Sequence, residues 1–204
     1  MHTLKYSLLA LGLLCVNSLS ALEDPSINLK ESVSNVLGVL YDESFSKKEA
    51  SEKELIILDK LAQNYDMDII IRRCIGRNWQ KIEESSQSVV LSLIKRLVVR
   101  AYCDGMKGQM KPDIKFKDTV FISDKRAEIE TFILLGNSKI NLTYKFGKMK
   151  SGWQIFDIVI ENISLVVTYR NQFDAFFTNN NSEALVKQLR KLLLDEDLGQ
   201  KLPI

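Results

Sequence analysis

The sequence predicts a single α+β domain in which helices pack against one face of an antiparallel sheet. Apolar residues recur at helical spacing from residue 25 to about residue 103, and beyond Pro112 the spacing changes to two, as in strands. Helices grouped before strands are typical of α+β folds, whereas α/β folds alternate the two. We therefore expect a four-stranded or five-stranded sheet, with N-terminal and C-terminal helices packed on it and an apolar cavity between sheet and helices.

Four helices are expected in the N-terminal half. Asp24-Pro25 is a capping residue followed by proline at the first helical position, and Ser51–Glu54 has the form of a capping box. Residues 66–75 form a short helix that Gly76 stops, and residues 84–103 form a long one. Each helix carries one apolar stripe, so all four need a common surface to pack against.

Four strands are expected next, followed by two helices. The strands cover residues 114–117, 127–135, 139–148 and 152–170, and the helices residues 171–177 and 182–194. The strand at 152–170 has apolar residues on both faces, with Trp153, Ile155, Val159 and Ile163 on one side and Phe156, Ile158 and Ile160 on the other. Such a strand is either covered by protein on both faces or lines a cavity for an apolar ligand.

Residues 1–21 have the pattern of a secretory signal peptide. Lys5 supplies the basic start, Tyr6–Val16 an apolar stretch, and Ser18–Ala21 a cleavage site of small residues. Eleven apolar residues are fewer than the roughly 20 that span a bilayer, although a retained membrane anchor is the alternative. We expect residues 22–204 to form one exported domain.

The composition argues against several classes of function. His2 is the only histidine and lies in the signal peptide, so the mature chain lacks the imidazole that Ser-His-Asp and Cys-His catalysis and many metal sites require. Lys5 is the only one of 28 basic residues in that peptide, which leaves 27 against 26 acidic ones. This near neutrality gives no reason to expect nucleic-acid binding. We expect a binding protein without a cofactor, and not an enzyme.

Two cysteines remain after the signal peptide, Cys74 and Cys103. If their helices form an antiparallel pair, the two residues lie about 20 Å apart at roughly 1.5 Å per residue. A disulfide requires Cα atoms within about 7 Å. Free thiols are therefore favoured, with a bridge as the alternative.

Three blocks of sequence carry a family resemblance. They are Tyr65-Asp66 leading to Gly76-Arg77-Asn78-Trp79; Arg100-Ala101-Tyr102; and Gly152-Trp153, Phe156-Asp157, Glu161-Asn162-Ile163-Ser164 and Tyr169-Arg170-Asn171-Gln172-Phe173. From about residue 25 to 191 the chain resembles the MlaC family, the periplasmic phospholipid-binding component of the bacterial Mla lipid-transport system, also called the toluene-tolerance auxiliary protein. Asn162 stands where the family usually has glycine, although asparagine tolerates left-handed conformations better than most residues.

The resemblance implies a periplasmic carrier that holds the acyl chains of a phospholipid between sheet and helices. The implied partners are an inner-membrane ABC transporter with its substrate-binding subunit and an outer-membrane lipoprotein–porin complex. The implied role is to maintain the lipid asymmetry of the outer membrane. Such a carrier needs no catalytic residue, and phospholipid is its cargo.

Ten residues on the expected strands and at the end of the long helix are candidate lipid contacts. For any one of them ordinary core packing is at least as well supported, and the alternative function is a periplasmic interaction module with a filled core and a non-lipid ligand. The candidates are Tyr102, Phe132, Leu134, Tyr144, Phe146, Trp153, Phe156, Ile158, Ile160 and Val166.

Overall fold

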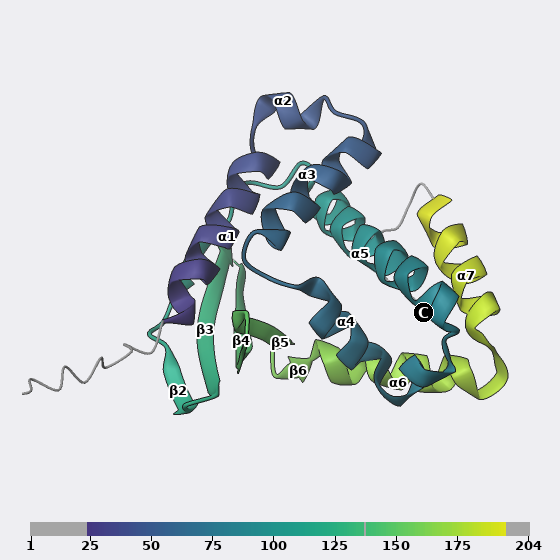
Figure 1. Cartoon of the computed structure of the whole chain (residues 1–204). Coiled ribbons are helices and arrows are strands. Elements are labelled where there is room, and N and C mark those ends of the chain that lie inside the picture. Colours follow the sequence, from purple (N-terminus) through teal and green to yellow (C-terminus); the bar gives the residue numbers. More distant parts are fainter. Residues whose placement is uncertain (1–23, 137, 195–204) are drawn as a thin grey trace, which may run out of the picture.

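The computed structural model describes residues 24–136 and 138–194, so the expected signal peptide at residues 1–21 lies outside the described residues. Helices come first, strands follow, and two helices close the chain (Figure 1). The elements are α1 (Pro25–Leu40), α2 (Glu43–Ser46), α3 (Ala50–Ala62), α4 (Met67–Ile75), the 3₁₀ helix η1 (Gly76–Lys81), α5 (Glu84–Met106), β1 (Asp113–Phe116), β2 (Val120–Ser123), β3 (Arg126–Leu135), β4 (Ser138–Met149), β5 (Gly152–Ile160), β6 (Ile163–Ser164), α6 (Leu165–Asn179) and α7 (Ser182–Leu194).

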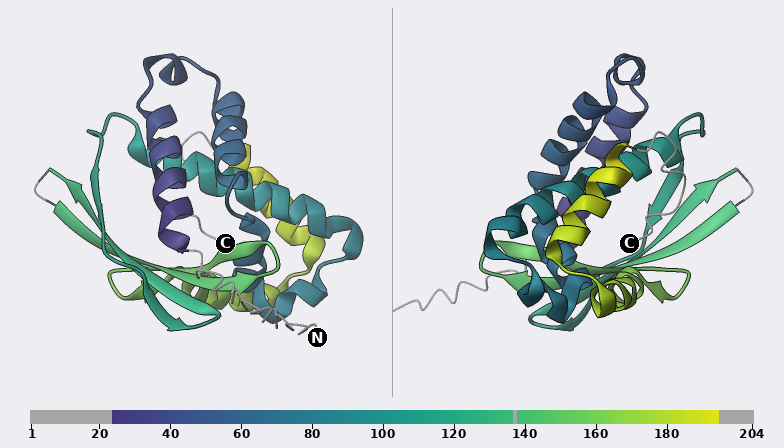
Figure 2. Two further views of the ribbon diagram at one scale, coloured as in Figure 1. Left: turned by 60° about the vertical axis from the view of Figure 1, so that its left-hand side comes forward. Right: turned by 90° about the vertical axis from the view of Figure 1, so that its right-hand side faces the viewer.

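The strands form one antiparallel sheet in the order β1-β3-β4-β5-β6, and β2 pairs with the same edge of β3 as β1 does. The sheet is curved, and the helices gather on one side of it (Figure 2). The predicted α+β class is therefore confirmed. The sheet has six strands in the described residues because the short strands β2 and β6 join the four that the sequence predicts.

Local hydrogen bonds explain where the N-terminal helices begin. Asp24 caps α1 by accepting from the Ser26 N–H at 2.9 Å, and Asp66 caps α4 by accepting from the Asp68 N–H at 2.9 Å. The expected capping box at Ser51 does not form, because α3 begins at Ala50. Glu54 is instead buried, where it accepts from Arg96 Nε of α5 at 2.7 Å.

The buried core is divided among three places. One cluster lies among α4, α5, α6 and α7, a second lies between α1 and the sheet, and a third joins α1, α2, α3 and α5. In the second cluster Leu29 of α1 and Tyr65 of the α3–α4 loop pack against Ile129 and Phe146 of the sheet. This cluster anchors α1 and the α3–α4 loop to the sheet.

A bulge in β5 changes which residues share a face. Lys145 of β4 pairs with Asp157 but the next residue, Phe146, pairs with Ile155, so Phe156 is the additional residue. Directly paired residues of antiparallel strands lie on the same face. The bulge therefore brings Ile158 and Ile160 to the face of Trp153 and Ile155. The predicted separation of these residues onto two faces is wrong.

The predicted strand at 152–170 ends earlier than expected. After Ile160 the chain turns through Glu161 and Asn162, whose φ angles are 46° and 65°. Ser164 then caps α6, its Oγ accepting from the Val167 N–H at 3.1 Å. Two successive residues with positive φ favour a tight reversal, so the chain reverses before the apolar run ends. Residues 165–170 consequently form helix, not strand.

Asn162 provides a test of this turn. We expect Asn162→Ala to lower the free energy of unfolding by about 1 kcal/mol, because alanine disfavours the left-handed conformation. Asn162→Gly adopts that conformation freely and should stay within about 0.5 kcal/mol of the parent. Urea unfolding of the three proteins measures the difference. Equal stability of the alanine and glycine variants would show that the turn does not require a positive φ at this residue.

Candidate functional site

An apolar cavity of about 310 Å³ lies between β5 and the helices α4, α5, α6 and α7. This volume lies within the range of about 300–1,000 Å³ that is common for small-molecule sites. Among the described lining residues only Asp66 is charged. The lining consists of Leu61, Tyr65, Asp66, Met67, Ile70, Ile71, Cys74, Ile94, Leu97, Val98, Ile155, Ile158, Leu165, Tyr169, Phe173, Leu189 and Leu192.

The spacing of the lining residues follows from the elements that carry them. On α6 the lining positions are Leu165, Tyr169 and Phe173, which are four residues apart and so lie on one face of the helix. On β5 both Ile155 and Ile158 line the cavity although they are three residues apart. The bulge at Phe156 accounts for this odd spacing.

Two of the titratable residues in the cavity wall, Cys74 and Tyr169, are neutral near pH 7. Burial raises the pKa of the Cys74 thiol to about 12, with Asp157 adding to the rise and Arg170 and Arg73 opposing it. Burial also raises the pKa of Tyr169. A thiol with so high a pKa carries very little thiolate near neutral pH and is a poor nucleophile. The wall is therefore suited to holding an apolar molecule by burial.

The cavity is unfavourable for the fold while it stays empty. Apolar side chains that border an unfilled space lack the van der Waals contacts that a packed core provides. An apolar ligand that fills the space stabilises the fold by restoring the missing contacts.

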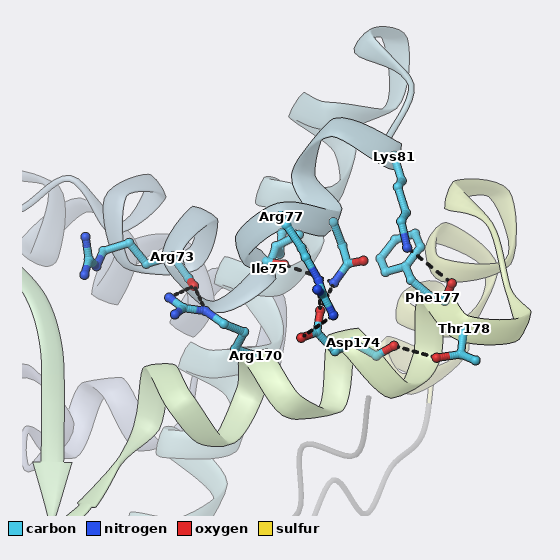
Figure 3. Close-up of polar contacts among 9 residues, drawn as sticks. Arg73, Ile75, Arg77, Lys81, Arg170, Asp174, Phe177 and Thr178 are labelled. Carbon is cyan, nitrogen blue, oxygen red and sulfur yellow. Dashed lines mark hydrogen bonds and ion pairs between the residues drawn. The ribbon is translucent and has the colours of Figure 1, made fainter.

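Polar contacts outside the cavity hold α4 and η1 against α6 (Figure 3). Asp174 of α6 accepts from the Asn78 side-chain amide at 2.6 Å and from Arg77 Nε and Nη2 at 3.3 Å. Arg170 donates to the Arg73 carbonyl through Nε at 3.1 Å and Nη2 at 2.7 Å. We call these five residues the α4–α6 clasp. It fixes the separation of two neighbouring helices that both contribute to the cavity wall.

Gly76 allows the clasp to close. It ends α4 with φ +60°, and a Cβ atom at this position would lie 3.0 Å from Arg170 Nε. Any other residue would therefore combine backbone strain with crowding against Arg170. Arg100 of α5 donates to the Leu193 carbonyl in the last turn of α7 at 2.5 Å, which joins two other helices that line the cavity.

The ten predicted contact residues do not all lie together. Ile158 lines the cavity. Tyr144, Phe146 and Trp153 lie in the cluster under α1, where burial and the neighbouring Tyr102 raise the pKa of Tyr144 to about 12. Tyr102 itself lies near the end of α5 and is 42% exposed. Ile160 is half-buried on the face of Ile158, where it pairs with Leu142.

The remaining predicted residues lie elsewhere. Phe132 and Leu134 of β3 lie on the opposite face from Ile129, and the Lys117 and Lys139 ammonium groups lie 5.1 and 3.8 Å from the Phe132 ring. Phe156 lies at the bulge, with the Arg73 and Arg126 guanidinium groups 4.8 and 4.4 Å from its ring. Val166, expected on a strand, is buried on α6. Lipid contact by any of the ten stays a prediction.

Most of the cavity wall comes from helices that were considered only as packing elements. The sequence signal was present as apolar stripes on the helices at residues 66–75, 84–103 and 182–194. A stripe of this kind shows which face is turned inward but not whether the space inside is filled. The lining residues that the site prediction omitted include Ile70, Cys74, Val98, Tyr169 and Leu192.

Three further findings concern the described part of the chain. Cys74 and Cys103 are free, as favoured from their expected separation. No helix between residues 24 and 194 is both long and apolar enough to cross a membrane. Within the same residues, no group of three or more histidine, cysteine, aspartate or glutamate side chains is arranged to hold a metal ion.

Comparisons with known proteins relate the chain to a family and to a solved fold. The sequence model of the MlaC protein family matches residues 30–191. The phospholipid-binding protein from Ralstonia solanacearum, solved in complex with a phospholipid, has a TM-score of 0.72 and 21% identity, over 82% of this chain and 96% of that chain. At this identity the likeness shows a shared fold.

Two other comparisons do not relate the chain to a further protein. A domain of unknown function with a cystatin-like fold from Nostoc punctiforme is 19% identical, over 48% of this chain and 67% of that chain, with a TM-score of 0.26, which is too low to indicate a common fold. No curated protein matches the chain.

Asn78 tests the clasp. The residue is 1% exposed, and its amide donates to Asp174 and, at 3.4 Å, to the Ile75 carbonyl. We expect Asn78→Ala to lower the free energy of unfolding by about 1–3 kcal/mol, because it removes one buried and one partly buried hydrogen bond. Gln80→Ala, at an exposed position of the same 3₁₀ helix, is the control and should change stability by less than about 0.5 kcal/mol. Equal urea midpoints for the two variants would contradict this role of Asn78.

Cys74 tests the environment of the cavity. Only the thiolate reacts with N-ethylmaleimide, so a pKa of about 12 predicts that alkylation accelerates about tenfold per pH unit from pH 7 to 10. A short cysteine peptide with blocked ends, whose thiol has a pKa of about 8.5, is the control, and its rate should level off above about pH 9. Because the pKa lies above its unfolded value of about 8.5, the free energy of unfolding should also fall as pH rises above 8.5. A Cys74 rate that levels off near pH 9 would show that the thiol is not buried.

Proposed function

Because the chain belongs to the MlaC protein family, we propose that it is a phospholipid carrier of the bacterial periplasm, with the acyl chains of its cargo in the apolar cavity. The observation that carries the proposal is the cavity itself, with one charged residue among its described lining residues. The phospholipid-binding protein from Ralstonia solanacearum has the same fold and holds a phospholipid. Acyl chains have the chemistry that such a lining favours.

The physical requirement for a carrier is the exclusion of water from acyl chains. Burial of each CH₂ group is worth about 0.8 kcal/mol, so a lipid with two chains does not cross an aqueous space unaided at a useful rate. Transfer from a membrane to an apolar cavity exchanges one apolar environment for another. Net transfer is then close to thermoneutral, and its direction comes from partners that use ATP.

The finer parts of the proposal rest on the sequence. Residues 1–21 act as the export signal, and residues 22–204 form one phospholipid-binding domain in the periplasm. The family resemblance supports exchange with an inner-membrane ABC transporter and its substrate-binding subunit, and with an outer-membrane lipoprotein–porin complex. In this role the carrier maintains the lipid asymmetry of the outer membrane. The neutral Cys74 thiol in the wall fits a binding protein better than an enzyme.

Filling the cavity tests the proposal. Val98→Trp places an indole ring at a half-buried lining position of α5, so we expect uptake of a fluorescent phospholipid from vesicles to fall at least tenfold. Because the added ring enters space that is not filled, the free energy of unfolding of the lipid-free protein should change by less than about 1.5 kcal/mol.

Val167→Trp is the matched control, because Val167 is 53% exposed on α6 and does not line the cavity. It should take up lipid at the parent rate. Unchanged uptake by Val98→Trp would contradict the proposed place of the acyl chains, and failure of the parent to take up any lipid would contradict the proposed function.

A further inference from the structure

A polar pocket of about 620 Å³ lies beside the apolar cavity. It is bounded by the end of α3, the α3–α4 loop, α5 and the turn between β4 and β5. Its wall is held in place by hydrogen bonds, since Asn64 Nδ2 donates to Ser32 Oγ at 2.9 Å and the Asp66 N–H donates to Gln154 Oε1 at 2.8 Å. Ser92 and Lys95 of α5 supply further polar groups.

The two pockets meet at three consecutive residues. Tyr65, Asp66 and Met67 belong to the lining of both. A polar pocket that joins an apolar cavity matches the two halves of an amphiphilic molecule. The polar part of a ligand whose apolar part lies among α4–α7 would therefore meet the polar pocket at these three residues.

Tyr65 carries a hydroxyl group whose environment is unusual. The residue is 8% exposed, and within residues 24–136 and 138–194 its hydroxyl has no hydrogen-bond partner. Buried hydroxyl groups in native proteins are nearly always paired, so an unpaired one calls for an explanation. A polar atom of a ligand that lies across the junction would provide the missing partner.

The charges at the pocket are mixed in sign. Lys95 of the lining has its Nζ 2.9 Å from Asp68 Oδ1, and these side chains are 31% and 28% exposed. Asp68 directly follows the lining residue Met67, and Asp66 belongs to the lining of both pockets, which gives one positive and two negative groups. A head group with both a phosphate and a protonated amine finds a partner for each charge. A head group whose only charge is a phosphate faces two carboxylates and one ammonium.

We propose that the polar pocket receives the head group of the bound lipid and favours a zwitterionic aminophospholipid over an anionic one. Lys95 faces the phosphate, Asp68 and Asp66 face the amine, and the Tyr65 hydroxyl donates to an oxygen where the head group meets the acyl chains. This inference rests on the proposed carrier function and adds a head-group preference to it.

The test offers the protein two lipids at once. The lipid-free full chain is incubated with vesicles of phosphatidylethanolamine and phosphatidylglycerol in equal amounts with identical acyl chains, and the extracted lipid is quantified after re-isolation. We expect at least a threefold excess of phosphatidylethanolamine. Equal loading by both lipids overturns the head-group preference while leaving the carrier function intact. Loading by neither overturns the carrier function itself.

Two substitutions separate the roles of the charges. Asp68→Asn removes a partner of the amine, so the ratio of bound phosphatidylethanolamine to phosphatidylglycerol should shift at least threefold toward phosphatidylglycerol. Glu183→Gln, at an exposed position of α7, should leave this ratio unchanged. Lys95→Gln removes the partner of a phosphate that both lipids share. It should reduce retention of both about tenfold, with Lys187→Gln as its exposed control. If Asp68→Asn does not change the lipid ratio, or Lys95→Gln does not change lipid retention, the proposed position of the head group is wrong.

Tyr65→Phe gives an independent readout, because it removes only the hydroxyl. We expect lipid to dissociate several times faster from the variant while the melting temperature of its lipid-free form is unchanged or higher. An unchanged dissociation rate contradicts the role of this hydroxyl. Glycerophosphoethanolamine, the head group without acyl chains, should not bind measurably by calorimetry. Binding as tight as that of the lipid would show a separate site for a soluble phosphodiester.

Discussion

The organisation of this protein depends on a space that its own side chains leave unfilled. Helices α4–α7 turn apolar faces toward β5, yet the side chains on those faces leave an unfilled cavity between the helices and the strand. Such a space destabilises the fold while it is empty, and an apolar ligand removes that penalty. The walls must therefore be held apart by contacts that do not depend on packing across the cavity.

The residues that resemble the family meet this requirement from outside the cavity. Asp66 caps α4, Gly76 ends it, and Arg170 of α6 donates to the Arg73 carbonyl in the last turn of α4. Arg100 performs a similar role between α5 and the end of α7. These residues are specific because each needs a defined geometry, whereas the lining needs only apolar side chains of suitable size. The family pattern is therefore more visible around the site than within it.

Much of the fold follows from the sequence because its signals are local. Apolar stripes place the helices, and alternation places β1, β3 and β4. The end of β5 could not be placed in this way, because residues 152–170 are apolar at both spacings. The reversal at Glu161–Asn162 and the cap at Ser164 decide between strand and helix, and both act through backbone geometry.

The site is harder to predict for a physical reason. Ile158 was predicted and lines the cavity, whereas Phe146 and Trp153, which are also large apolar residues, pack under α1. Whether an apolar side chain meets protein or open space depends on the distance between elements that are far apart in sequence. A single bulged residue, Phe156, also changes the face of every later residue of β5. Neither effect can be recognised from the pattern of apolar residues in the sequence.

The most direct measurement of the central claim is native mass spectrometry of the full chain expressed in a bacterium and purified without added lipid. We expect a population heavier than the polypeptide by the mass of an intact phospholipid, which organic solvent releases. Only the bare polypeptide mass, both before and after incubation with phospholipid vesicles, would contradict the claim that the cavity is a lipid site.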